Sequence, residues 1–251
     1  MRKLIFIAVV LLAITFLASQ AEAVMFISGG AVAPAGCSQG AMAFSEDFEL
    51  IAEGEEWDDD GNWTEATAST DKYIGDNAIV NEGNLSGQVN TSGSHWIDMS
   101  ATYTSIGGTG TATFQHDFYY TTSAEGATVI LTDGNGQYGV TGNQRVYMQV
   151  ASGGKLQNRG NGGSWYDVLG SGFTANTWHT IEVEIDLEQS DGIEALTYWV
   201  NGSQISTLYD TRNRSDPGSG IDTIAVNGWI SSTPARYYDD IRLYDGDRCA
   251  P

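Results

Sequence analysis

The stretch WHTIEVEIDL at residues 178–187 decides the fold, because its side chains alternate between apolar and polar. Successive side chains of a β-strand point to opposite faces of a sheet, so one set faces the core and the other faces outward. The apolar set is Ile181, Val183, Ile185 and Leu187, and the polar set is Thr180, Glu182, Glu184 and Asp186. The stretch therefore predicts a half-buried strand of an antiparallel sheet.

A hairpin follows this strand in the sequence. The alternating run at 196–200 leads through Asn201-Gly202 into a third run at 204–209. Asn-Gly between two such runs predicts a two-residue turn, since both central residues of a type I′ turn need positive φ. Further strands are predicted between clusters of Gly, Asn, Asp and Ser, at 44–51, 96–103, 112–120, 128–132, 145–150, 155–158, 224–230 and 236–244. Many short strands without helical periodicity favour an all-β sandwich.

Composition and charge narrow the possible partners. The chain has 251 residues, of which 41% are hydrophobic and 17% charged, and it contains 31 glycines. Lys and Arg total 11 against 32 Asp and Glu, which gives a formal net charge of −21. This charge repels phosphate backbones and anionic lipids, so nucleic-acid and membrane-surface binding are not expected.

Residues 1–23 predict a cleaved signal peptide. Arg2 and Lys3 precede an apolar run at 4–18, and Ala21-Glu22-Ala23 places small residues before a cleavage site at Val24. A retained anchor helix is the alternative, but the apolar run is short for a membrane span. We expect a lead segment at 24–43 and a single domain at 44–251, without membrane insertion after processing. The expected location is extracellular or at the cell surface, with the periplasm as a further option.

The two cysteines, Cys37 and Cys249, stand near opposite ends of the predicted mature chain. In an oxidising compartment they can pair and tie the two ends together. Two unpaired thiols in the terminal segments are the alternative. We predict the disulfide.

Aromatic residues on outward positions are candidates for glycan contact. Alternation places Tyr119, Tyr147 and Trp199 on outward positions of one sheet, with Arg145 on the same side as Tyr147. Trp165 and Tyr166 stand in a Gly-rich loop. Sugar rings stack their C–H faces on exposed aromatic rings, so these six residues are predicted to bind ligand. For each aromatic residue, packing in the core or at its rim is the alternative.

Several runs together resemble a known fold family. They are FQHDFYY at 114–120, KL at 155–156, WHTIEVEID at 178–186, YWVNG at 198–202, EDFE at 46–49 and YYDDIRLY at 237–244. They resemble the concanavalin A-like jelly roll over residues 44–245, and more narrowly the laminin-G-like (LamG-type) domains of secreted bacterial proteins. The two ends are also similar to those of jelly-roll carbohydrate-binding modules. The resemblance implies a two-sheet antiparallel jelly-roll β-sandwich that binds glycans on its concave face or loop edge, often with a structural calcium ion.

One acidic run resembles a catalytic motif of the same fold. Glu184, Asp186 and Glu188 match the E-x-D-x-E strand of laminarinase- and agarase-type hydrolases, and alternation would place them on one face as a retaining mechanism requires. The context differs, because here the WH-initiated strand itself holds the triplet and YWVNG follows directly. We expect a solvated acidic strand edge and no catalysis.

Three acidic residues near the chain ends are candidate calcium ligands: Asp47, Glu49 and Asp239. Asp239 alternates in phase with Ile241 and Leu243, so its carboxylate is predicted to point inward. A buried carboxylate needs a cation or hydrogen-bond donors. Calcium, which prefers clustered hard oxygens, is one alternative, and backbone N–H groups or an arginine are the other.

These observations lead to a primary functional hypothesis and two alternatives. The primary hypothesis is a secreted, noncatalytic carbohydrate-binding or adhesive domain that takes a polysaccharide or glycan and is stabilised by calcium. The first alternative is a polysaccharide-cleaving hydrolase or lyase of the same fold. The second is a self-associating structural protein of a matrix, surface layer or filament.

Overall fold

The computed structural model describes residues 40–60, 62–65, 73–89, 96–99, 105–121, 127–132, 144–151, 153–160, 163–188, 196–208, 220–228 and 236–249. The predicted signal peptide, nearly all of the lead segment and Cys37 lie outside the described residues and stay predictions. In the part of the chain that the structure describes, no helical segment has the length and apolarity needed to cross a membrane.

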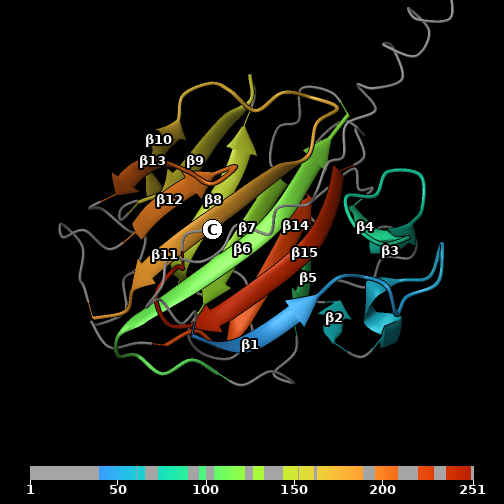
Figure 1. Cartoon of the computed structure of the whole chain (residues 1–251), viewed down its shortest axis with the longest axis horizontal. Coiled ribbons are helices and arrows are strands. Elements are labelled where there is room, and N and C mark those ends of the chain that lie inside the picture. The colour runs from blue at the N-terminus through green and yellow to red at the C-terminus, as the bar shows by residue number, and fades with distance from the viewer. Residues whose placement is uncertain are drawn as a thin grey trace, which may run out of the picture. The chain divides into compact units, whose positions relative to one another are not determined.

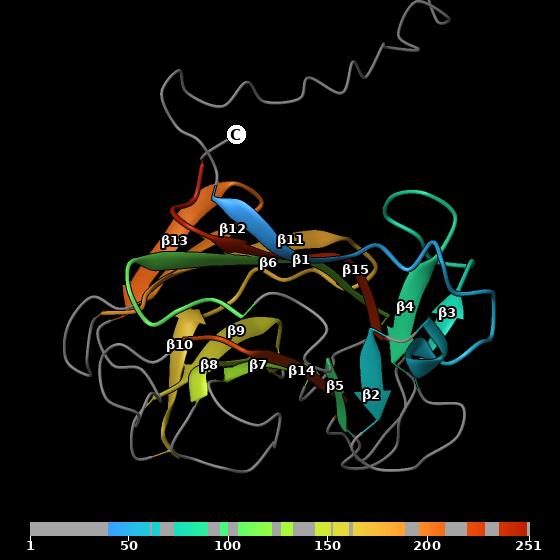
Figure 2. The same ribbon diagram turned by 90° about the horizontal axis from the view of Figure 1, so that it is seen from below.

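The chain forms two antiparallel sheets that lie face to face as two layers (Figure 1 and Figure 2). The eight-stranded sheet has the order β13-β12-β11-β6-β15-β4-β3, and β1 also pairs with β15. Its strands are β1 (Ala41–Glu46), β3 (Tyr73–Asp76), β4 (Ser86–Val89), β6 (Thr111–Tyr120), β11 (His179–Asp186), β12 (Leu196–Val200), β13 (Ser203–Leu208) and β15 (Arg236–Asp245).

The seven-stranded sheet has the order β10-β9-β8-β7-β14-β5-β2. Its strands are β2 (Trp63–Glu65), β5 (Trp96–Met99), β7 (Ala127–Thr132), β8 (Gln144–Ala151), β9 (Lys155–Arg159), β10 (Trp165–Leu169) and β14 (Thr223–Gly228). A short 3-10 helix, η1 (Trp57–Asp60), precedes β2. The predicted all-β, two-sheet antiparallel sandwich is confirmed.

One apolar core fills the space between the sheets. From β11 it receives Ile181, Val183 and Ile185, each at most 1% exposed. From β7 and β8 it receives Val129, Leu131, Val146 and Met148. A buried aliphatic side chain of this kind stabilises a fold by about 1.5–3 kcal/mol. The alternation that predicted the strand at 178–187 therefore matches the observed core.

The Asn-Gly hairpin also forms as predicted. Asn201 and Gly202 have φ values of 50° and 75°, the positive values that a type I′ turn requires. They connect β12 to β13, which pair as neighbours. The hairpin forms the edge of the eight-stranded sheet.

The first strand is shorter than predicted, because β1 ends at Glu46 and Phe48 takes a positive φ of 60°. The buried Glu46 carboxylate accepts the N–H of Phe48 at 2.7 Å and the indole N–H of Trp63 at 3.2 Å. It also accepts the side-chain amide of Asn62 at 3.2 Å. Glu46 thereby joins the end of β1 to β2 of the other sheet.

Four strands are absent from the sequence prediction: β2, β3, β4 and β10. Each has five residues or fewer, and β3 and β4 contain glycine, so none shows a measurable alternation. β10 begins at Trp165, so the predicted loop around Trp165 and Tyr166 is wrong.

Candidate functional site

The outward face of the eight-stranded sheet carries a ladder of side chains across β11, β6 and β15. The pairing registers and one ring contact place residues of the three strands, together with Trp178 just before β11, on common rungs. The aromatic rung is Trp178, Tyr119 and Tyr237; the acidic rung is Thr180, Asp117 and Asp239; the charged rung is Glu182, Gln115 and Arg242. Same-face positions along a strand are about 7 Å apart, so the rungs are close neighbours.

A β-bulge in β15 creates the acidic rung. The register of β15 against β6 shifts just after Asp239, and Asp240 has a φ of 49°. The extra residue reverses the alternation, so Asp239 lies opposite Asp117 on the outward face while Ile241 and Leu243 stay in the core. The predicted inward orientation of Asp239 is therefore wrong, because strict alternation holds only as far as the bulge.

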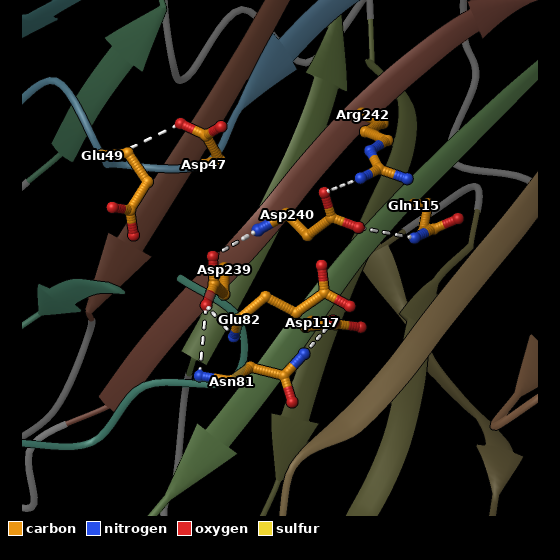
Figure 3. A network of polar contacts seen from close by, with 9 residues as sticks. All are labelled: Asp47, Glu49, Asn81, Glu82, Gln115, Asp117, Asp239, Asp240 and Arg242. Atoms are coloured by element: carbon orange, nitrogen blue, oxygen red, sulfur yellow. Dashed lines mark hydrogen bonds and ion pairs between the residues drawn. The ribbon is translucent and has the colours of Figure 1, made fainter. Parts of the chain in front are cut away.

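Backbone donors hold the Asp239 carboxylate, which is 1% exposed. Its Oδ2 accepts the N–H groups of Asn81 and Glu82, each at 3.2 Å, and its Oδ1 accepts the N–H of Asp240 at 2.9 Å (Figure 3). Burial raises the pKa of Asp239 to about 7, and the three hydrogen bonds lower it only in part. These contacts correspond to the second predicted alternative, in which backbone N–H groups bond the carboxylate.

Asp117 is also buried, at 5% exposure. Its carboxylate accepts the side-chain amide of Asn81. Burial raises the pKa of Asp117 to about 6; a hydrogen bond from Thr180 lowers it, and the charges of Asp240 and Glu82 raise it further. Figure 3 shows the Glu82 side chain extending toward Asp117 and Asp240. Negative charge therefore gathers at this point of the face.

Arg242 pairs with one of these carboxylates. It forms an ion pair with Asp240, whose other oxygen accepts the Gln115 amide at 3.2 Å (Figure 3). Burial raises the pKa of Asp240, and the Arg242 charge lowers it in part. The guanidinium therefore neutralises Asp240 most directly and leaves the acidic rung with an excess of negative charge.

The three predicted metal ligands meet at one cleft of about 160 Å³. The residues that line it are Ser45, Asp47, Glu49, Glu82, Gly83, Asp239, Asp240 and Arg242. Carboxylate oxygens are donors that calcium prefers. Glu82 and Asp240 are additions that the sequence did not single out, because Glu82 has no strand pattern around it and Asp240 is the bulge residue.

The acidic side chains of the cleft already have hydrogen-bond donors. Glu49 Oε1 accepts the N–H groups of Asn84 at 2.5 Å and Leu85 at 2.9 Å, and the pKa of Glu49 is lowered chiefly by its bonds to Asn84. Asp47 accepts the N–H of Glu49 at 3.2 Å. Among the residues that the structure describes, no three His, Cys, Asp or Glu side chains stand in a metal-binding arrangement. The carboxylate oxygens suit calcium as donors, but in this structure several of them accept hydrogen bonds from N–H groups.

A clamp formed by Arg248 covers the outward side of β11 and β12. Its guanidinium donates two hydrogen bonds to Glu182, at 2.6 and 3.1 Å, and lies 4.6 Å from the centre of the Trp199 ring. Its backbone N–H donates to Glu184 at 2.9 Å. The Arg248 side chain is only 5% exposed. The predicted ligand-binding face of Trp199 is thus occupied by the chain's own guanidinium.

The three carboxylates that resemble a catalytic motif accept backbone hydrogen bonds. Glu184 accepts the N–H of Arg248, Asp186 accepts the N–H of Glu188 at 3.0 Å, and Glu188 accepts the N–H of Gly110 at 3.3 Å. Glu188 stands in the turn after β11, not in the strand.

The outward face of the seven-stranded sheet holds a different group, which we call the Trp165 patch: Tyr147, Trp165 and Arg159. The rings of Tyr147 and Trp165 pack edge to face at 5.2 Å, and the Arg159 guanidinium lies 5.4 and 5.5 Å from their centres. Tyr147 is 4% exposed and packs with Ile130 and Ala225, whereas Trp165 and Arg159 are half-buried. Trp165 and Arg159 are therefore the accessible members.

Amide and charged side chains continue this patch along β8, β9 and β10. Gln149 and Gln157 are hydrogen-bonded at 2.8 Å, and Gln157 donates to Asp167 at 2.6 Å. Lys155 pairs with Asp167 at 3.2 Å. Polar groups thus stand beside an aromatic surface, the usual composition of a small-ligand site.

The predicted ligand residues do not form one surface. Tyr119 and Trp199 belong to the eight-stranded sheet and Tyr147 to the seven-stranded sheet, so the predicted single face is wrong. The assignment failed because alternation gives the two sides of a strand and not the sheet that the strand joins.

Two other predicted ligand residues lie away from the Trp165 patch. Arg145 is 2% exposed and donates to the backbone carbonyl of Leu187 at 3.0 Å, so its predicted outward position is wrong. Tyr166 is exposed, but it follows Trp165 directly in β10 and points to the other side of that strand.

No protein-family model and no curated protein matches the chain. Solved structures do match. Endo-β-1,4-glucuronan lyase from the fungus Trichoderma reesei is 12% identical, with a TM-score of 0.55 over 84% of this chain and 98% of its own. Alginate lyase Aly36B, in complex with alginate trisaccharide, is 12% identical, with a TM-score of 0.56 over 84% and 100%. Domain 4 of AbnA, an extracellular arabinanase from Geobacillus stearothermophilus in complex with arabinotriose, is 11% identical, with a TM-score of 0.50 over 83% and 94%. At these identities the likeness establishes the sandwich fold.

Proposed function

We propose that this chain is a secreted, noncatalytic carbohydrate-binding or adhesive domain that binds a glycan on the Trp165 patch. The observation that carries the proposal is the Trp165 indole beside the Arg159 guanidinium and two hydrogen-bonded glutamines. An indole offers a surface for a sugar ring, and guanidinium and amide groups bond hydroxyl or carboxylate oxygens. The named activities and ligands of the similar structures, on glucuronan, alginate and arabinotriose, support a glycan as the ligand.

The experiment is a polysaccharide binding panel with the wild type and two variants of one strand. Trp165→Ala removes the accessible ring and is expected to weaken binding by about tenfold or more. Tyr166→Ala removes an exposed ring on the other side of β10 and is expected to leave affinity unchanged. Thermal unfolding of both variants checks that the fold is intact. Equal losses in both folded variants, or no binding by the wild type to any polymer, would overturn the proposal.

Cleavage of the bound polymer is the competing function, because two of the similar structures are named as lyases. The same panel separates the two functions. Under our proposal neither reducing ends nor unsaturated sugar products appear on prolonged incubation. Product that disappears in Arg159→Gln while that variant still binds the polymer would establish an enzyme instead.

We also propose that calcium stabilises the domain through the acidic cleft. Asp47, Glu49 and Asp239 supply hard oxygen donors from both ends of the sandwich domain, and Asp240 and Glu82 add two more carboxylates. An ion there would offset the like charges that gather around Asp239 and Asp240. The role of the protein side chains is to hold the ion and so to join β1, β15 and the loop at 81–85.

A further inference from the structure

We propose that the outward face of the eight-stranded sheet is a second saccharide-binding surface, and that its ligand is an amine-bearing glycan in its protonated form. The surface consists of the aromatic rung with the acidic rung beside it, and Glu82 lies over the acidic rung. It lies on the opposite sheet from the Trp165 patch, so it goes beyond the proposed function.

Ring contacts and hydrogen bonds hold the aromatic rung in place. The rings of Trp178 and Tyr119 are 5.4 Å apart, and those of Tyr119 and Tyr237 are 5.8 Å apart. The Tyr237 hydroxyl accepts the Gln88 amide at 2.9 Å, and the Tyr119 hydroxyl donates to Asn176 at 3.4 Å. Trp178 and Tyr119 are half-buried, so part of each side chain is accessible to a sugar.

The distance between rungs fits one sugar ring and its substituent. The acidic rung is about 7 Å from the aromatic rung along the strands, because the two are separated by two residues. A pyranose on Trp178 and Tyr119 would therefore bring a substituent to Thr180 and Asp117 of the acidic rung. Figure 3 shows the exposed Glu82 side chain extending toward Asp117. The position and the charge of the acidic rung and Glu82 therefore determine which substituent is bound there.

The charge of this surface favours a cation. Asp117, Asp239, Asp240 and Glu82 gather at one place, and the nearby Arg242 is ion-paired with Asp240. An anionic sugar would be repelled, and a neutral one would leave the charge uncompensated. A protonated amine compensates it and can donate hydrogen bonds to the exposed Glu82 carboxylate.

The same sheet already binds a cation by this chemistry. Arg248 places its guanidinium between the Glu182 carboxylate and the Trp199 ring, at 2.6 Å and 4.6 Å. The pair Glu182 and Trp199 stands opposite one another on β11 and β12. On the second surface the Trp178 indole likewise lies on the rung next to a carboxylate, because Trp178 contacts Tyr119 and Asp117 stands two residues before Tyr119 on β6.

The test uses glucosamine oligomers and their N-acetylated counterparts, at a pH at which the amine is protonated and with EDTA present. Titration calorimetry of the wild type is expected to give at least about tenfold tighter binding of the amine form. Equal affinity for both forms, or no binding of the amine form, overturns the proposal.

Three variants locate the binding. Trp178→Ala is expected to weaken binding of the amine form about tenfold, and Glu82→Gln about fivefold, while the N-acetylated form loses nothing in Glu82→Gln. Trp165→Ala, on the other sheet, is expected to bind the amine form like the wild type. If Trp165→Ala removes the binding and Trp178→Ala does not, the amine form is bound at the Trp165 patch and this second surface is refuted, while the proposed function stands.

Discussion

At the scale of single residues, the carboxylates of Asp117 and Asp239 dominate the candidate site. They lie on one rung of neighbouring strands, and like charges placed opposite each other destabilise a sheet. The N–H groups of Asn81 and Glu82 and the Asn81 amide offset this repulsion in part. Burial still holds both pKa values well above that of a free aspartate, at about 6 for Asp117 and about 7 for Asp239.

The raised pKa values predict that the protein is more stable in mild acid. The folded state binds these protons more tightly than the unfolded chain, whose aspartate pKa is 3.8. The stabilisation is complete below that value and is lost as the pH rises through about 6 for Asp117 and about 7 for Asp239. Thermal unfolding in EDTA should therefore give a higher Tm at pH of about 5 than at about 8, by about 2–4 °C for each kcal/mol gained.

Asp239→Asn separates this effect from the relief of general charge repulsion. The variant lacks the titrating group but keeps nearly all of the −21 formal charge. Its Tm should rise less than that of the wild type over the same pH range. An identical rise would show that Asp239 does not titrate in this range.

Calcium should act on the same residues with the opposite pH dependence. At pH of about 8, above the pKa of about 7 for Asp239, that carboxylate is charged, and calcium is expected to raise the Tm by binding the folded state. The rise should shrink near pH of about 5, because protons compete with the ion at Asp239. Glu49→Gln removes one of the charged donors and should weaken the response. A response of equal size in Glu49→Gln would place any calcium site elsewhere.

At the scale of secondary-structure elements, the segment at 246–249 ties β15 to its neighbour β6 and to β11 and β12, with which β15 does not pair. It follows β15, and Thr113 of β6 donates a hydrogen bond to the Gly246 carbonyl at 2.9 Å. Arg248 then reaches Glu182 and Glu184 of β11 and Trp199 of β12. The segment therefore crosses the sheet on its outward side and stabilises the order β12-β11-β6-β15.

Breaking this clamp should be costly. Arg248→Ala leaves Glu182 buried without the bidentate guanidinium, and such a loss destabilises a protein by about 3–5 kcal/mol. Chemical denaturation of Arg248→Ala, Glu182→Gln and the double variant would measure it. The double variant should be more stable than the sum of the two single losses implies. Strictly additive losses would mean that the ion pair itself contributes nothing.

At the scale of the whole molecule, the two outward faces differ in charge. The described charged residues of the Trp165 patch and its continuation are Arg159, Lys155 and Asp167. The outward face of the eight-stranded sheet instead carries the acidic rung, the cleft carboxylates, Glu182 and Glu184, against the cations Arg242 and Arg248. Under the two proposals above, one sandwich would offer two surfaces that favour polymers of different charge.

The sequence predicts the fold better than it predicts the candidate site. Long alternating strands such as β6 and β11 are predictable, because two-residue periodicity follows directly from strand geometry. Asp239 was misplaced because an inserted bulge residue reverses that periodicity. The Arg248 clamp was not predicted, because it joins positions 66 residues apart that no local pattern connects.

The predicted disulfide between Cys37 and Cys249 is a property of the whole chain. It would enclose more than 200 residues, and the chain-entropy model gives about 5 kcal/mol for a loop of that size. Reduction should then lower the Tm by about 10–20 °C. Peptide mapping without reductant should recover the two cysteine peptides as one linked species. Separate peptides and an unchanged Tm on reduction would contradict the pairing.

The carboxylates of Asp239 and Glu49 hold the loop at 81–85 and should slow its hydrogen exchange. The amide protons of Asn81 and Glu82 are donated to Asp239, and those of Asn84 and Leu85 to Glu49, up to 158 positions away in the sequence. In deuterated solvent, the amides of an exposed loop normally exchange at once. These four should exchange only when their hydrogen bonds to the carboxylates open. The amides of this surface loop should therefore exchange as slowly as those in the interior of the sandwich.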